Sequence, residues 1–525
     1  MKILLSDPIE KICADMLRAE GFEVDARPNL SPDELKKIIP AYDGLVVRSG
    51  TKVTADLISA GLNLKVIGRA GAGVDNIDVE AATRRGIVVM NTPGGNTISA
   101  AEHTMSMLLS LARNIPQAHE SLRQGKWDRK SYTGTELLEK TIGIVGLGKI
   151  GREVAFRCQA FGMKVIGFDP VLSADVASKA NIEPVSLEAL FERSDFITLH
   201  TPLTDETKGL IGEESLARCK SGVRIVNCAR GGIIDEPALL RGLESGKVAG
   251  AALDVFEKEP PGENPLLKHP HLIATPHLGA STEEAQEKVA RQIATQIGDM
   301  LKERGIAGAV NAEALHLSLK KELKPYVVLA EKLGSLVAQL MNGKMKKISI
   351  TCSGAFLSSS LELMTAAVLK GLFAKLLSEP VNLVNAPTIA REMGLAIDEE
   401  RESENPSYKH LLTVRTETDK ESRRFAGTVF SDTYARLVRV DDFHFEVNPE
   451  GFLLFYTNID RPGMLASVGA TLADEKINIA GLSLGRDKPG QKALTVINVD
   501  TALTDQVLGK LQKIDGVFEV RSVWL

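Results

Sequence analysis

The feature that most limits the fold of this chain is a glycine-spaced turn inside a strand, helix, strand sequence. Residues 141–170 read TIGIVGLGKIGREVAFRCQAFGMKVIGFDP, and Gly146, Gly148 and Gly151 lie between a short apolar run and a helical pattern. A second apolar run follows and ends at Asp169, eighteen residues after Gly151. This order predicts a β-α-β unit of a parallel sheet that binds a dinucleotide at the helix N-terminus.

Each residue of this turn has its own expected role. Gly146 permits the tight turn, Gly148 lets the backbone approach a pyrophosphate, and Gly151 packs the helix against the strand. The helix N-terminus offers unpaired N–H groups and the positive end of its dipole to the phosphates. Asp169 would bind the ribose hydroxyls and repel a 2′-phosphate, which favours NAD over NADP. The alternative is a glycine-rich turn of another α/β protein.

Short apolar runs alternate with helical segments on both sides of this unit. The earlier runs are KILLSD, FEVDAR, GLVVRSG, LKVIGRAG and IVVMNTP, and the helices between them are expected at residues 9–20, 32–39 and 55–60, with Ser31 as an N-cap. Such alternation predicts right-handed crossovers and parallel sheets. A helix at 99–113 would carry the chain to a second sheet, and one at 282–304 would return it to the first.

The chain therefore divides into four expected domains. Two are Rossmann-like, doubly wound parallel-sheet α/β domains: a substrate-binding domain (residues 1–98 and 283–314) and an NAD-binding domain (residues 99–282). An α+β intervening domain follows at 315–448. It has a polar, loop-rich passage expected at 384–410 and no recognisable catalytic or binding motif. Residues 449–525 show the βαββαβ order of a small regulatory module.

Length, charge and cysteine content exclude several classes of protein. At 525 residues the chain is too long for one core. A net charge of -5 is not typical of a nucleic-acid-binding protein, so any anion-binding basic site must be local. No apolar run reaches the roughly 7–15 residues of a secretion signal or the roughly 20 of a membrane helix. The five cysteines are scattered without metal-ligand spacing. We expect a cytoplasmic protein with reduced thiols, no metal and no membrane contact.

Three polar residues follow strands of the second series: Arg230 in NCARGGIID, Glu259 in DVFEKEP and His277 in ATPHLGAST. Strand-end loops of a parallel sheet converge on the cofactor crevice. A histidine suits removal of a hydroxyl proton, a carboxylate beside it fixes the ring, and an arginine grips a substrate carboxylate. Each residue alone could be a loop-capping histidine, a surface arginine or a solvated turn charge, but their shared placement favours an active site.

At these residues the chain resembles the D-isomer-specific 2-hydroxy acid dehydrogenase family. The motifs, which extend over residues 2–311, are VVRSGTKV, GRAGAGVDNID, NTPGGNTISAAEHT, GKWDRKSYTGTEL, GLGKIGREVA, NCARGGIIDEPAL, ALDVFEKEP and TPHLGAST. The stretch NIDRPGMLASVGATLADEKINIA resembles the ACT domain. The chain is most similar to long-form members of the family. That resemblance implies NAD-dependent oxidation of 3-phospho-D-glycerate to 3-phosphohydroxypyruvate, the first step of L-serine biosynthesis.

The resemblance also assigns individual residues. Arg230, Glu259 and His277 occupy the catalytic positions, with His277 as the acid/base. The positions that line NAD are Ala72, Lys149, Ile150, Asp169, Thr201, Cys228, Ala229, Arg230, Asp254, His277, Leu278, Gly279 and Ala280. The substrate-facing positions are Arg48, Ser49, Arg69, Gly71, Asn91 and Thr92.

The residues themselves support the assignment of Arg48 and Arg69. Each interrupts or ends an apolar strand pattern, where a charge is costly unless an anion meets it. A phosphate at the far end of the substrate would be such an anion. The alternative is that the two arginines pair with aspartate or glutamate side chains.

The C-terminal resemblance implies regulation. An ACT domain usually binds a small amino acid between chains, and Asn458, Asp460 and Asn478 occupy the effector positions, with L-serine as the possible effector. If inhibition occurs, it must act through two states of the assembly. By resemblance we expect a homotetramer in which the loop carrying Trp127 reaches across a dimer interface.

Two other functions compete with this one. A glyoxylate or hydroxypyruvate reductase would resemble the first half of the chain but normally lacks the two C-terminal domains. An NAD-sensing scaffold, like the transcriptional corepressors that share this fold, belongs to another class of protein. The ACT-like module and the lack of a basic tail argue against a scaffold.

Overall fold

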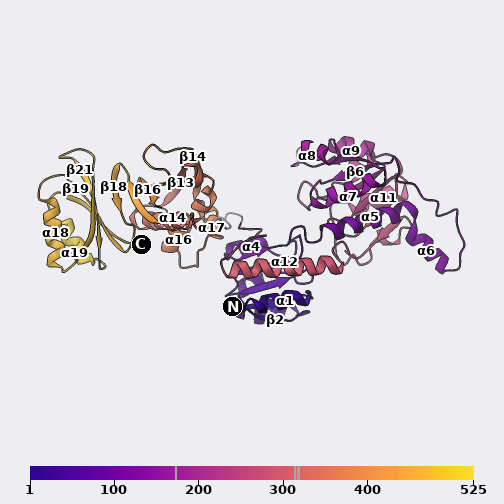
Figure 1. Cartoon of the computed structure of the whole chain (residues 1–525), viewed down its shortest axis with the longest axis horizontal. Helices are drawn as coiled ribbons and strands as arrows, with labels where there is room; N and C mark the ends of the chain where they lie inside the picture. Colours follow the sequence, from indigo (N-terminus) through magenta and orange to yellow (C-terminus); the bar gives the residue numbers. More distant parts are fainter. Residues whose placement is uncertain (172–173, 313–314, 316–319, 432) are drawn as a thin grey trace.

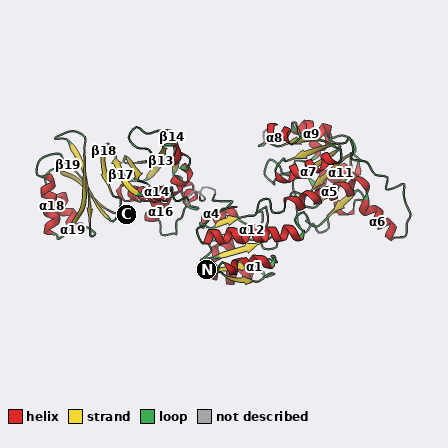
Figure 2. Ribbon diagram, in the orientation of Figure 1, coloured by secondary structure: helices red, strands yellow, loops and turns green. Residues whose placement is uncertain are grey.

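The computed structural model describes residues 1–171, 174–312, 315, 320–431 and 433–525. Four sheets form an elongated row, with the two parallel sheets toward one end and the mixed and antiparallel sheets toward the other (Figure 1). Helices lie on both sides of each parallel sheet (Figure 2).

The first sheet has five parallel strands in the order β2-β1-β3-β4-β5. The strands are β1 (Lys2–Leu5), β2 (Glu23–Ala26), β3 (Gly44–Val47), β4 (Val66–Arg69) and β5 (Val88–Met90). One face is covered by α1 (Lys11–Ala19) and α12 (Glu283–Leu301), and the other by α2 (Pro32–Ile38), α3 (Ala55–Ala60) and α4 (Val79–Arg84). Ser31 caps α2 in a capping box with Glu34, as its sequence predicts.

The second sheet has seven parallel strands in the order β12-β11-β10-β9-β6-β7-β8. The strands are β6 (Thr141–Val145), β7 (Lys164–Phe168), β8 (Glu183–Pro184), β9 (Phe196–Leu199), β10 (Val223–Asn227), β11 (Val248–Leu253) and β12 (Leu272–Ala274). α5 (Thr97–Arg113) and α7 (Lys149–Ala160) cover one face, and α9 (Leu187–Arg193), α10 (Glu213–Arg218) and α11 (Glu236–Glu244) the other. α6 (Ile115–Arg123) and α8 (Ala174–Lys179) complete this domain. The strand order reverses between β6 and β9, where ligands bind in such sheets.

The third sheet is mixed, in the order β14-β13-β15-β16-β17-β18. The strands are β13 (Met345–Ser353), β14 (Ala396–Glu402), β15 (Leu411–Thr418), β16 (Ser422–Phe430), β17 (Tyr434–Val440) and β18 (Phe443–Val447). The helices are α14 (Lys324–Leu340), α15 (Ala355–Ser358), α16 (Leu361–Leu376) and α17 (Ala386–Glu392). α14 and α16 pack together and supply much of this domain's core.

The expectation of a loop-rich passage at residues 384–410 was wrong in part, because α17 and β14 lie inside it. β14 pairs in parallel with β13 at the sheet edge. An edge strand tolerates charged side chains, and those of β14 find partners on β13: Asp398 pairs with Lys347, and Glu400 accepts a hydrogen bond from Thr351.

The fourth sheet is antiparallel, in the order β20-β21-β19-β22. Its elements are β19 (Phe452–Ile459), α18 (Met464–Asp474), β20 (Ile479–Arg486), β21 (Lys492–Val499), α19 (Asp505–Gln512) and β22 (Val517–Trp524). The two helices pack on one face, while Phe455, Val496 and Val523 from the sheet join the core around α14. The predicted fold class, two Rossmann-like domains followed by an α+β domain and a βαββαβ ACT domain, is confirmed.

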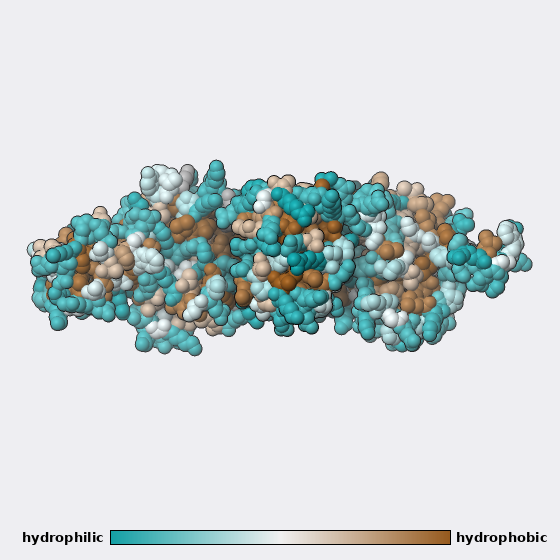
Figure 3. Space-filling view, turned by 90° about the horizontal axis from the view of Figure 1, so that it is seen from below, coloured by the Kyte–Doolittle hydropathy of each residue, from teal (hydrophilic) through white to brown (hydrophobic). Residues whose placement is uncertain are grey.

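The face of the molecule in Figure 3 is mainly hydrophilic, with apolar side chains gathered in separate patches. Within the described residues, every helix is too short or too polar to cross a membrane. The expected domain boundary at residues 314–315 falls beside 313–314 and 316–319, which lie outside the described residues, so this boundary stays a prediction.

Candidate active site

The glycine turn joins β6 to α7. Gly146 has a φ of 92°, and a Cβ built there would lie 2.5 Å from the carbonyl oxygen of His200. A Cβ on Gly151 would overlap the carbonyl oxygen of Gly146, whereas a Cβ on Gly148 would meet no atom within 4 Å. The turn is therefore tightly packed on its inner side and open where a pyrophosphate would approach the N-terminus of α7.

Asp169 directly follows β7, beside this turn. Its Oδ2 accepts a hydrogen bond from the Leu147 N–H at 2.8 Å, and its Oδ1 accepts one from the Val171 N–H at 2.9 Å. After β9, the buried hydroxyl of Thr201 has no hydrogen-bond partner among the described residues. A buried hydroxyl without a partner is costly unless a ligand meets it. The open turn, the carboxylate and this hydroxyl fit NAD.

His277 and Glu259 form the central pair of the site. The Nδ1 of His277 lies 2.8 Å from Oε2 of Glu259, and Oε1 of Glu259 accepts a hydrogen bond from the Phe256 N–H at 3.1 Å. This contact with Glu259 raises the pKa of His277 above its ordinary value, although partial burial acts in the opposite direction. Burial acts to raise the pKa of Glu259, but the hydrogen bond and charge of His277 hold it below its usual range. The described residues provide no hydrogen-bond partner for Nε2 of His277.

Arg230 extends from the loop after β10 toward the first sheet. Its Nε donates to Asp75 at 3.0 Å, and its Nη1 donates to the carbonyl oxygen of Ala229 at 2.7 Å. Asp75 lies in the glycine-rich loop after β4, so this ion pair joins the two parallel-sheet domains. Asp75 was not predicted from the sequence. An acidic residue in a strand-end loop was the available signal, but its partner is 155 residues away.

Arg48 and Arg69 lie near each other, and Arg69 lies near Arg230. Among the described residues neither has an acidic side chain within 4.0 Å of its guanidinium, so the alternative of two ion-paired arginines is not seen there. Nη1 of Arg48 lies 3.5 Å from Oε1 of Gln286, and Arg69 donates to the carbonyl oxygen of Gly73. Burial lowers the pKa of Arg69, and the nearby charges of Arg230 and Arg48 lower it further.

The other predicted positions lie at the same ends of the strands. Lys149 and Ile150 begin α7, Cys228 and Ala229 follow β10, Leu278, Gly279 and Ala280 follow β12, and Ala72 follows β4. Burial raises the pKa of the Cys228 thiol to about 12. Asn91 donates to the Ala72 carbonyl oxygen, the Thr92 N–H donates to Gly71, and Ser49 is exposed. The hydroxyl of Thr92 is buried without a partner in the described part of the chain.

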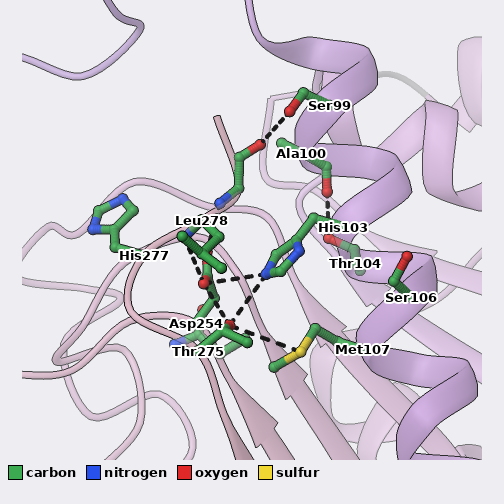
Figure 4. A network of polar contacts seen from close by, with 12 residues as sticks. Ser99, Ala100, His103, Thr104, Ser106, Met107, Asp254, Thr275, His277 and Leu278 are labelled. Carbon is green, nitrogen blue, oxygen red and sulfur yellow. Dashed lines mark hydrogen bonds and ion pairs between the residues drawn. The ribbon is translucent and has the colours of Figure 1, made fainter. Parts of the chain in front are cut away.

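Asp254 differs from these residues because its side chain is 0% exposed. Its carboxylate is surrounded by donors from the segment of residues 275–279 and by His103 of α5 (Figure 4). From the sequence, Asp254 was expected to line NAD, whereas His103 was not among the predicted site residues. The contact of Asp254 with NAD stays a prediction.

The expected effector residues do not meet within one chain. Asn458 and Asp460 lie at the end of β19, where Ile459 pairs with Lys492. Asn478 precedes β20, whose first residue pairs with Val499 at the opposite end of the sheet. Asn458 is buried with its Oδ1 unpaired among the described residues, and Asp460 pairs with Arg486 at 3.2 Å.

The combination of a dinucleotide-binding turn, a histidine–carboxylate pair and an arginine defines a class, the NAD-dependent dehydrogenases of 2-hydroxy acids. Family models agree with this class. Residues 105–279 match the NAD binding domain of D-isomer specific 2-hydroxyacid dehydrogenase, residues 322–441 match the D-3-phosphoglycerate dehydrogenase intervening domain, and residues 452–516 match the ACT domain.

Known proteins narrow the class to one family. The chain is 44% identical to D-3-phosphoglycerate dehydrogenase of Archaeoglobus fulgidus over 100% of both chains, and 41% identical to that of Bacillus subtilis over 99% of both. The chain belongs to the D-3-phosphoglycerate dehydrogenase family. Among solved structures, D-lactate dehydrogenase of Aquifex aeolicus complexed with NAD and lactic acid matches with a TM-score of 0.53 and 28% identity, over 58% of this chain and 96% of that one. The protein is an NAD-dependent oxidoreductase.

Proposed function

We propose that this enzyme oxidises 3-phospho-D-glycerate to 3-phosphohydroxypyruvate, the first step of L-serine biosynthesis. The cluster of Arg48, Arg69 and Arg230, where the two parallel-sheet domains meet, carries this proposal. A Cβ built on Gly73 would contact the guanidinium groups of both Arg69 and Arg230, so the two side chains lie close together. A substrate with a carboxylate at one end and a phosphate at the other brings negative charge to these cations.

The geometry assigns a role to each group of the site. Arg230 binds the substrate carboxylate with the side of its guanidinium that Asp75 leaves free. His277 accepts the proton of the C2 hydroxyl at Nε2, and Glu259 stabilises the imidazolium that results. NAD, when bound on the glycine turn, supplies the acceptor for the hydride that leaves C2. In the reverse direction His277 returns its proton to the carbonyl oxygen.

An assay with NADH tests the substrate. We expect kcat/KM for 3-phosphohydroxypyruvate to exceed that for hydroxypyruvate by about 100-fold, because each charge-assisted hydrogen bond to phosphate contributes about 1.5–3 kcal/mol. Arg48→Gln should lower this preference about tenfold and leave the rate with hydroxypyruvate unchanged. Equal rates with both ketones would contradict the proposal and favour a hydroxypyruvate reductase.

Replacing Glu259 by glutamine should change both rate and pH dependence. In the oxidation direction neutral His277 is the active form, so the rate rises with pH through its pKa, which Glu259 raises above the ordinary value. Glu259→Gln removes the charge that stabilises imidazolium and should move this inflection to lower pH. It should also lower kcat by about 10- to 100-fold, because the ring loses its fixed tautomer. An unchanged pH–rate profile would remove Glu259 from this role.

The ACT domain implies a small-molecule effector, and we propose that it is L-serine, bound between two chains. Because Asn478 lies at the opposite end of its sheet from Asn458 and Asp460, a pocket containing all three needs a second chain.

We propose a cytoplasmic homotetramer. Exposed apolar side chains on and near α6 and α7 support an interface: Ile115, Leu122, Trp127 and Phe156.

Titration with L-serine tests this regulation. The wild type should be inhibited, and Asp460→Ala should raise the half-inhibitory concentration about tenfold or more without changing the uninhibited kcat, since the effector site is remote from the chemistry. Asp474→Ala, at an exposed position on α18, is the matched control and should behave as the wild type. Equal inhibition of both variants would show that Asp460 does not contact the effector.

A further inference from the structure

The backbone that carries His277 depends on a buried carboxylate. His277 has a φ of 56°, in the left-handed region that residues with side chains seldom adopt. Its N–H donates to the carbonyl oxygen of Asp254 at 2.9 Å. The next two N–H groups donate to the carboxylate of Asp254, that of Leu278 to Oδ1 at 2.7 Å and that of Gly279 to Oδ2 at 2.8 Å. The position of the imidazole therefore depends on Asp254 staying ionised and in place.

Thr275 and two side chains of helix α5 supply the remaining donors to this network. The hydroxyl of Thr275 donates to Asp254 Oδ1 at 2.6 Å, which leaves its oxygen free to accept a hydrogen bond. His103 Nε2 lies 3.2 Å from that oxygen and 3.1 Å from Asp254 Oδ1. Both neighbours are acceptors there, so His103 Nε2 must carry the hydrogen and donate. One turn earlier, the Ser99 hydroxyl donates to the carbonyl oxygen of Gly279 at 2.9 Å.

The side chains that hold Asp254 lie on the other side of that carboxylate from the His277 imidazole. In Figure 4 the His103 ring points into the network from α5, while the His277 ring points away from it on the other side of Asp254. Burial acts to raise the pKa of Asp254, and hydrogen bonds from His103, Thr275 and Leu278 hold it below its ordinary value. If one donor to the fully buried Asp254 carboxylate is removed, the ionised carboxylate becomes less stable. The hydrogen bonds that it accepts from the backbone after His277 then become less secure.

We propose that His103 and Ser99 are positioning residues for His277. α5 follows the crossing of the chain from the first sheet to the second, and it packs on β10, β11 and β12. His103 of this helix contacts Asp254, and Ser99 contacts Gly279, so the two contacts lie on either side of His277. This inference rests on the proposed function, because it assigns His277 as the group that exchanges the proton with the substrate.

The test compares two substitutions of His103 in the full-length enzyme with NADH and 3-phosphohydroxypyruvate. His103→Leu removes the donor, and we expect kcat to fall about tenfold or more, as small misplacements of a reacting group do, with the KM for NADH changing by less than about threefold. His103→Gln keeps an N–H donor at the same reach and should restore most of kcat. Ser106→Ala, at an exposed position on the same helix, is the matched control and should keep wild-type kcat.

A double-mutant cycle separates positioning from other effects. In a His277→Ala background, His103→Leu should change kcat by less than about twofold, because the group it positions is gone. A full effect in that background, an unchanged kcat in His103→Leu alone, or equal losses in the Leu and Gln variants would overturn the proposal. Failure of the proposed function would look different. The wild type would not reduce 3-phosphohydroxypyruvate, or His277→Ala alone would keep its activity.

Discussion

Replacing His277 by alanine is expected to lower kcat by about 10²–10⁴-fold, the range for loss of a general acid/base. Nδ1 of the imidazole lies 2.8 Å from Glu259, and within the described residues its Nε2 has no hydrogen-bond partner, so His277 is the group we expect to exchange the proton with the substrate. The affinity for NADH should change little, because the glycine turn and Asp169 are untouched. Stopped-flow measurement of NADH oxidation, together with a fluorescence titration of NADH binding, separates the two quantities.

His271→Ala is the matched control for this substitution. His271 is exposed in the loop just before β12, six residues before His277, and its loss should leave kcat within about twofold of the wild type. Retained activity in His277→Ala, or an equal loss in both variants, would contradict the assignment of the proton to His277.

Replacing Arg230 by alanine should give the largest decrease in kcat/KM for the keto acid. Loss of the charge-assisted hydrogen bonds from Arg230, whose side chain is 30% exposed, should cost about 2–4 kcal/mol, equivalent to about 30- to 1,000-fold. Asp75, whose Oδ2 lies 3.0 Å from Nε of Arg230, would also remain beside the site as an uncompensated negative charge that repels the substrate. The loss should therefore appear mainly in KM for the keto acid and in kcat, and less in NADH binding, because the glycine turn and Asp169 remain.

Two further variants define the cause of this loss. Arg230→Lys keeps the charge but not the planar fork, so it should recover only part of the activity. Arg241→Ala removes a surface arginine of α11 that pairs with Glu213 and should behave as the wild type. If Arg230→Ala kept wild-type kcat/KM, the substrate carboxylate would have to bind elsewhere.

The parts of the fold that were predicted correctly from the sequence have local causes. The capping box at Ser31 fixes the start of α2 through atoms three residues apart. The tight packing of Gly151 against Gly146 likewise depends on neighbours within one turn. The strand-end positions of Arg230, Glu259 and His277 follow from the alternation of strands and helices, because parallel sheets bring such ends to one side.

The parts that could not be predicted depend on distant partners. The pairing of Arg230 with Asp75 and the approach of His103 to Asp254 join residues more than 150 positions apart. Each of these side chains alone is typical of a solvated loop or helix face. β14 was missed because its charged residues resemble a loop until β13 lies beside it. Only the register of the last sheet shows that Asn478 lies far from Asp460.

The most direct test of this account is a crystal structure of the enzyme with NAD and 3-phospho-D-glycerate. We predict that the C2 hydroxyl lies about 3 Å from Nε2 of His277, within hydrogen-bonding reach, with the carboxylate on Arg230 and the phosphate near Arg48 and Arg69. A substrate bound with its C2 hydroxyl away from His277, or with its phosphate remote from both arginines, would contradict it.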